Sequence, residues 1–213
     1  MAKRVTDGSL LTTNERSRIK QIGEPIALLL GRIGFSPDAL TLVGFGIVLV
    51  AAVQVALGNW AIAAAVLIAG TLFDGLDGTL ARATNRVTPF GAFFDSSLDR
   101  AAEAAIYAGV VYSAAVIGDT RIATAAALAL GIGSLVSYVR ARGEGLGVSA
   151  HGGIAQRAER AVLLILGLLV AGLTAETSYL LYALVIIVAL SGITVVQRMN
   201  VVRAALATTG RRA

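Results

Sequence analysis

Two pairs of aspartates lie within or next to apolar stretches of this chain. Asp74 and Asp77 are three residues apart, and Asp95 and Asp99 are four apart. On helices, residues at these spacings share one face. A carboxylate inside a membrane costs roughly 2.5–3.5 kcal/mol on insertion scales. The four aspartates therefore need a compensating interaction, and the pattern predicts that bound cations supply it.

The residue composition limits which cation can bind. The chain has no cysteine and a single histidine, His151, so a metal must be held by oxygen ligands. Oxygen-only ligation favours a hard ion such as Mg²⁺, Mn²⁺ or Ca²⁺. Four carboxylates suit two divalent ions, and a pair of metals stabilises displacement at phosphorus. The alternative is that the carboxylates share protons or form ion pairs, with Arg82 and Arg100 as available partners.

Six apolar stretches are long enough to cross a hydrocarbon core about 30 Å thick. The chain is 56% hydrophobic and 15% charged, whereas soluble domains are typically about 25% charged. We expect an all-α integral membrane bundle of six transmembrane helices. The spans are predicted near residues 38–58, 60–82, 89–117, 120–142, 158–175 and 178–200.

The link between the second and third spans, Ala83–Pro89, is short enough to make these helices antiparallel neighbours. Measured from the ends of the two spans at 1.5 Å per residue, the four aspartates lie about 7.5–13.5 Å inward. They are therefore predicted to meet at similar depth. Gly78, Ala81 and Gly91 lie on or beside the same faces, where small residues leave room for a ligand or serve helix packing.

Basic residues set the expected orientation. Most of the 18 Lys and Arg residues fall in the N-terminal segment, the loops after the second and fourth spans, and the C-terminal tail. Because such residues concentrate in cytoplasmic loops, both termini and the aspartates are expected on the cytoplasmic side of the inner membrane. Topology thus explains the net charge of +5, and nucleic-acid binding is excluded.

The polar N-terminus does not resemble a cleaved signal peptide. Residues Ile19 to Gly34 mix charged and apolar side chains, which predicts an amphipathic helix in the membrane interface. A short seventh buried helix is the alternative. The expected organisation is a juxtamembrane segment over 1–35, the six-helix domain over 36–205 and a cytoplasmic tail over 206–213.

The residues from Asp74 to Asp99 match every fixed position of the pattern D-x2-D-G-x2-A-R-x8-G-x3-D-x3-D. On these residues the chain resembles the CDP-alcohol phosphotransferase family, and the six-span layout is similar too. The resemblance implies a membrane enzyme of phospholipid synthesis. Such an enzyme transfers a phosphatidyl group from CDP-diacylglycerol to an alcohol and releases CMP, using two divalent metals, Mg²⁺ or Mn²⁺. It also implies a homodimer.

The resemblance further implies roles for individual residues. The metal ligands would be Asp74, Asp77, Asp95 and Asp99, with Asp99 also the general base on the acceptor hydroxyl. The implied contacts to the CDP-lipid are Asp38, Thr41, Gly78, Ala81, Arg82, Gly91 and Ser137. Ser36-Pro37-Asp38 also reads as a helix start, with Ser36 as the cap and Pro37 at the first position; both interpretations can hold together.

The acceptor is predicted from basic residues near the cytoplasmic ends of later spans. Stretches around Arg140, Arg160 and Arg198 resemble the bacterial phosphatidylinositol-phosphate synthases, in which the matching positions bind the phosphate of inositol phosphate. That group commonly has Lys where Arg140 stands and Pro where Ala158 stands, and neither change removes a positive charge. Glycerol 3-phosphate is the alternative acceptor, as in phosphatidylglycerophosphate synthases. Some of these arginines also fit simple snorkelling to the interface.

Two other classes of protein remain as alternatives. A divalent cation transporter also carries intramembrane aspartates, but it should place them near mid-bilayer and has no need of the glycine and alanine spacing. An inactive scaffold would bind no CDP-lipid.

Overall fold

The computed structural model describes residues 25–150 and 152–209, and helices are the only regular elements in these ranges. Residues 25–32 are helical. The longer helices are α2 (Pro37–Ala56), α3 (Trp60–Ala83), α4 (Pro89–Val116), α5 (Thr120–Glu144), α6 (Arg157–Thr174) and α7 (Ser178–Thr209). They coincide closely with the six predicted apolar stretches, so the all-α prediction is confirmed.

Local sequence signals explain where several helices begin. The Ser36 hydroxyl accepts a hydrogen bond from the Ala39 amide at 3.1 Å, and Pro37 follows as the first helical residue of α2. α4 begins in the same way, with Thr88 as the cap and Pro89 as the first helical residue. A capping oxygen satisfies an amide that has no partner within the helix, and proline tolerates the first turn. The predicted helix start at Ser36 is confirmed.

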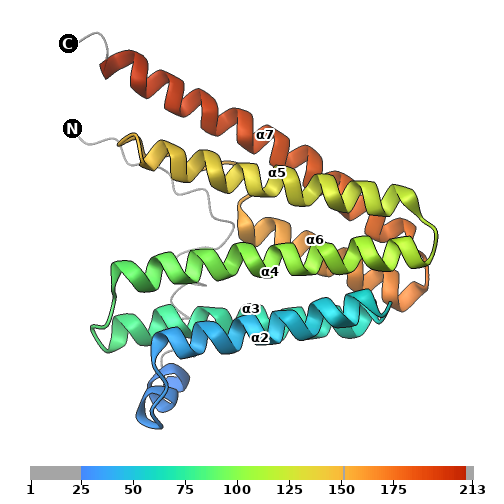
Figure 1. Cartoon of the computed structure of the whole chain (residues 1–213), viewed down its shortest axis with the longest axis horizontal. Helices are drawn as coiled ribbons and strands as arrows, with labels where there is room; N and C mark the ends of the chain where they lie inside the picture. The colour runs from blue at the N-terminus through green and yellow to red at the C-terminus, as the bar shows by residue number, and fades with distance from the viewer. Residues whose placement is uncertain (1–24, 151, 210–213) are drawn as a thin grey trace.

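The helices form two groups that diverge toward one end of the molecule. Figure 1 shows α2, α3 and α4 as one group in which α2 packs against both α3 and α4, with α5 and α7 separating from them toward the C-terminal end of α7. α4 contacts both α2 and α5, while α6 contacts α3 and α7. The α3–α4 link and the α5–α6 connection lie at this open end as well (Figure 1). This arrangement brings the acidic parts of α3 and α4 opposite the start of α6.

The apolar core lies at the opposite end, where the helices converge. Its buried members come from all six long helices and include Val55, Leu67, Tyr107, Ala126 and Leu184. The indole N–H of Trp60 is also buried there, and it donates to the Ser113 hydroxyl at 3.1 Å. Packing at this closed end fixes the helix positions, which leaves the open end available for polar groups.

Four of the described helices are long and apolar enough to cross a membrane: α2, α3, α5 and α7. Their outward faces carry large exposed apolar side chains such as Val53, Leu72, Leu128 and Val185. The helices α4 and α6 also contain charged residues, which in α4 include Asp95, Asp99 and Glu103. The chain is therefore a membrane protein in which two helices carry a large share of the interior charge.

Candidate functional site

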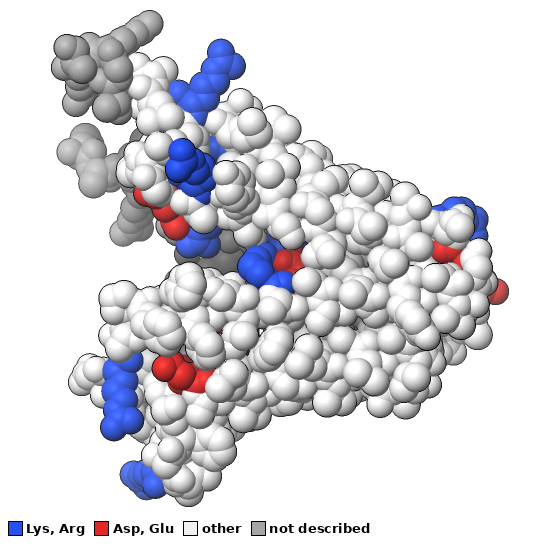
Figure 2. Space-filling model, in the orientation of Figure 1, with Lys and Arg blue, Asp and Glu red and all other residues white. Residues whose placement is uncertain are grey.

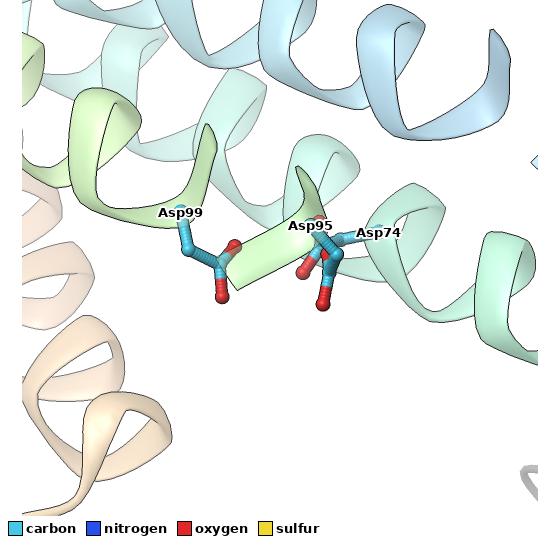
Figure 3. Close-up of side chains that lie close together, drawn as sticks. All are labelled: Asp74, Asp95 and Asp99. Carbon is cyan, nitrogen blue, oxygen red and sulfur yellow. The ribbon is translucent and has the colours of Figure 1, made fainter. Parts of the chain in front are cut away.

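Three of the predicted metal ligands converge at the open end. Asp74 of α3 and Asp95 and Asp99 of α4 each offer a carboxylate oxygen, and these oxygens all lie within 4.8 Å of one another. Figure 3 shows the three side chains pointing toward a common space between the helices. All three are half-buried. Carboxylate oxygens at this spacing, without nitrogen or sulfur ligands, fit a hard divalent cation such as Mg²⁺ or Mn²⁺.

Asp77 lies beside this cluster and faces α2. Its Oδ2 accepts a hydrogen bond from the Thr41 hydroxyl at 2.6 Å, and its Oδ1 accepts one from the Gly78 amide. The side chain is buried. These contacts hold one carboxylate of the predicted four slightly apart from the other three. Its oxygens are oriented by neutral donors that compensate for part of the lost hydration.

A groove of about 290 Å³ adjoins the cluster between α2, α3 and α4. Asp77 and Asp95 both line it. Six of the seven residues predicted to contact the CDP-lipid line the same groove: Asp38, Thr41, Gly78, Ala81, Arg82 and Gly91. The structure thus brings together residues from three helices that the sequence pattern had linked. Ser137 lies elsewhere, on α5, where its hydroxyl is 2.5 Å from the Arg100 guanidinium.

Two glycines keep this groove open. A Cβ added at Gly78 would lie 3.2 Å from the Arg82 guanidinium, and one at Gly91 would lie 3.1 Å from the Thr88 hydroxyl and 3.4 Å from the Asp38 carboxylate. Both contacts are closer than ordinary van der Waals separation. A larger residue at either position would therefore push a polar side chain of the groove out of place.

A second cavity, of about 340 Å³, lies on the other side of the cluster and contains Asp74, Asp99 and Arg157 among its lining residues. Arg157 is the first residue of α6. Its guanidinium contacts Asp74 Oδ2 at 3.0 Å and Asp99 Oδ1 at 2.6 Å. The aspartates therefore do have an arginine partner, although the alternative interpretation of the sequence named Arg82 and Arg100 as the available partners.

Arg100 instead forms an ion pair with Glu103 at 2.7 Å. Arg82 is 3.4 Å from the Thr79 hydroxyl and lines the first groove. Both arginines are thus near the cluster but have other partners.

The three arginines predicted to bind the acceptor phosphate have different environments. Arg160 is buried and contacts Glu103 at 2.6 Å. Arg198 is also buried, and it donates to the carbonyls of Gly152 and Val136, which ties α7 to the end of α5. Arg140 is exposed and pairs with Glu144 at 2.9 Å. Arg160 lines a small cavity that Arg157, the partner of Asp74 and Asp99, also lines.

Arg157 and Glu103 have the contacts of site residues, yet neither was predicted as a site residue from the sequence. In the sequence Arg157 is one of several arginines near the ends of the later helices. One signal was available: Asp95, Asp99 and Glu103 follow each other at intervals of four on α4, while Arg157 and Arg160 are three apart on α6. Figure 2 shows basic and acidic atoms at the inner end of the hollow between the two helix groups.

Comparisons with known proteins agree with this geometry. The family model described as CDP-alcohol phosphatidyltransferase matches residues 35–209. The archaetidylinositol phosphate synthase of Methanothermobacter thermautotrophicus is 39% identical over 86% of this chain and 90% of its own length.

Solved structures of the Mycobacterium tuberculosis phosphatidylinositol phosphate synthase are also similar. The structure with CDP-DAG bound has a TM-score of 0.81 and 31% identity, covering 85% of this chain and 94% of that one. The structure in complex with manganese and citrate has a TM-score of 0.80 and 30% identity, covering 84% of this chain and 88% of that one.

The position of Arg157 leads to a prediction about metal affinity. Its guanidinium would compete with a divalent cation for the oxygens of Asp74 and Asp99. We therefore expect the variant Arg157→Gln to bind Mn²⁺ about tenfold more tightly in the absence of nucleotide, a gain of ~1.4 kcal/mol in binding free energy. Isothermal titration calorimetry in detergent measures this. Arg203→Gln, which removes the same charge from an exposed part of α7, is the control. Equal or weaker Mn²⁺ binding by Arg157→Gln would contradict the prediction.

Proposed function

The chain belongs to the CDP-alcohol phosphatidyltransferase family, and we propose that it transfers the phosphatidyl group of CDP-diacylglycerol to inositol phosphate and releases CMP. The observation that carries the proposal is the position of the acidic cluster. Three carboxylates from α3 and α4 meet between a groove containing six residues of the family pattern and a cavity containing Arg157. Two substrates could approach the cluster from these two sides.

The nucleotide lipid is assigned to the first groove. In this proposal Gly78 and Ala81 admit the cytidine, Asp38 and Thr41 contact it, and Arg82 binds the diphosphate. The small residues of the groove support the assignment, because a Cβ at Gly78 or Gly91 would crowd its polar side chains. Ser137 remains a proposed contact of the same substrate from α5.

The chemical step is a displacement at phosphorus. Asp99 takes the proton of the acceptor hydroxyl, whose oxygen bonds to the phosphorus that carries the diacylglycerol. The bond from that phosphorus to the bridging diphosphate oxygen breaks, and CMP leaves. Two divalent metals held by Asp74, Asp77, Asp95 and Asp99 would neutralise the charge that develops on the phosphate oxygens. Asp77 is oriented for such a role by the Thr41 hydroxyl.

Inositol phosphate is favoured as the acceptor because a phosphorylated alcohol needs fixed cations beside the cluster. Arg160 is buried and lines a smaller cavity of about 80 Å³ that Arg157 also lines, and the planar guanidinium suits phosphate. Arg140 and Arg198 are proposed as further anchors. The two relatives described above, whose names specify inositol phosphate lipids, support the same choice. Glycerol 3-phosphate is the second candidate, since the same arginines could bind its phosphate.

For the membrane arrangement we propose six spans, with α4 and α6 crossing beside the four more apolar helices. The helical residues 25–32 would lie in the interface, consistent with the exposed side chains of Ile26, Leu28 and Leu29. The open end would face the cytoplasm, since Arg121 is the one Lys or Arg described at the closed end. We retain the division into 1–35, 36–205 and 206–213, and a homodimer, as parts of the proposal.

The decisive experiment measures CMP release. The purified protein is given CDP-diacylglycerol with Mg²⁺ or Mn²⁺, and inositol phosphate, glycerol 3-phosphate, inositol and serine are offered separately. We expect fast CMP release with inositol phosphate and its loss when the metal is chelated. Faster release with glycerol 3-phosphate would identify that acceptor instead. Metal flux into proteoliposomes without CMP release would contradict the enzyme and favour a transporter.

The role of Asp99 gives a separate prediction. Asp99→Asn keeps the size of the side chain but cannot take up the hydroxyl proton, so turnover should fall by about 10²-fold or more while CDP-diacylglycerol still binds. Asp119→Asn, which changes an aspartate at the closed end, should keep wild-type turnover. CMP release and equilibrium binding of the nucleotide lipid are measured on both variants. Wild-type turnover in Asp99→Asn would remove Asp99 from the mechanism.

A further inference from the structure

Glu103 of α4 lies between two guanidinium groups. Its Oε2 is 2.7 Å from Arg100, and its Oε1 is 2.6 Å from Nη2 and 3.1 Å from Nε of Arg160. The side chain of Arg160 is 2% exposed and that of Glu103 is 11% exposed. Burying one charge of a pair without its partner is strongly unfavourable. The buried Arg160 therefore depends on this carboxylate.

The contacts of Glu103 connect three helices around the site. Arg100 lies on α4 and also contacts the Ser137 hydroxyl of α5, while Arg160 lies on α6 and donates through Nη1 to the Ala155 carbonyl at 3.3 Å. An arginine has five N–H donors, and these contacts within the described residues use three of those on Arg160. Arg160 also lines a cavity of about 80 Å³, together with Arg157.

Two separate ion pairs join α4 to α6. Asp99 and Glu103 are four residues apart on α4, and Arg157 and Arg160 are three apart on α6. Asp99 pairs with Arg157 and Glu103 pairs with Arg160. Arg160 therefore has its own carboxylate partner on α4, separate from the aspartates that Arg157 contacts.

A glycine on α5 makes room for this pair. A Cβ added at Gly133 would lie 3.2 Å from Nε of Arg160 and 3.4 Å from Oε1 of Glu103. Gly131, on the same helix, has open space around the position of an added Cβ. The backbone of α5 thus approaches the ion pair closely, and it restricts where the Arg160 guanidinium can lie.

We propose that Glu103 is a positioning residue for the phosphate of the acceptor. It acts through Arg160, whose guanidinium it fixes beside the small cavity that Arg157, the partner of Asp99, also lines, and the inference rests on the proposed function in requiring a phosphorylated acceptor. Glu103 itself takes no part in the proton transfer. Its loss should weaken acceptor binding and leave the nucleotide-lipid groove intact.

The test compares Michaelis constants for the two substrates in the full-length protein. Glu103→Gln should raise the KM for inositol phosphate about tenfold or more, with the KM for CDP-diacylglycerol little changed. Glu103→Asp keeps the charge but reaches less far, so it should fall between the wild type and Glu103→Gln. Glu176→Gln, at an exposed glutamate of the α6–α7 connection, is the control and should match the wild type. Equal increases in both KM values, or an unchanged acceptor KM, would overturn the proposal.

A second pair of variants keeps the test decisive if Glu103→Gln does not fold. Gly133→Ala presses on the ion pair without removing a charge, so it should raise the acceptor KM alone, whereas Gly131→Ala should have no effect. The same acceptor KM in both glycine variants would overturn the positioning role of Glu103.

The wild-type acceptor assay separates this inference from the proposed function. If the enzyme uses glycerol 3-phosphate, only the named acceptor is wrong, and the variants are measured with that substrate under the same expectations. If it uses only alcohols without a phosphate, the role of Glu103 fails together with the proposed acceptor class.

Discussion

Repulsion among carboxylates at the open end is the constraint on which the rest of this structure depends. Two unit charges of the same sign about 4.8 Å apart repel by on the order of 3 kcal/mol at an effective dielectric constant of 20, and Asp74, Asp95 and Asp99 bring three oxygens within that distance. Nearby cations relieve this repulsion. Arg157 is one such cation, and the donor set is suited to divalent metals. The cost of gathering the carboxylates is offset if they bind metals, which can in turn bind phosphate.

The two ends of the fold support this cluster in different ways. At the closed end, residues such as Tyr107 and Leu184 pack the helices together. At the open end, α2 supplies Thr41 to orient Asp77, and α6 supplies Arg157 and Arg160 opposite Asp99 and Glu103. The charged groups of the candidate site thus lie at the open end, away from the main apolar core that fixes the helix positions.

Much of this arrangement could be predicted because its signals are local. Ser36 and Pro37 mark the start of α2 within three residues, and the spacing of the aspartates fixes which helix face they share. The partners across helices could not be predicted in the same way. Thr41 and Asp77 are 36 residues apart, and Arg157 and Asp74 are 83 apart. The spacing of residues along the sequence shows which of them share a helix face. The register of one helix against another is set by packing of the whole core.

The most direct test of the central claim is anomalous diffraction at the manganese edge from crystals grown with Mn²⁺. The account predicts peaks at ligand distance, roughly 2.0–2.6 Å, from carboxylate oxygens of Asp74, Asp95 and Asp99, with the Arg157 guanidinium moved away from them. A map with no peak at these oxygens, and with Arg157 still bridging Asp74 and Asp99, would contradict it.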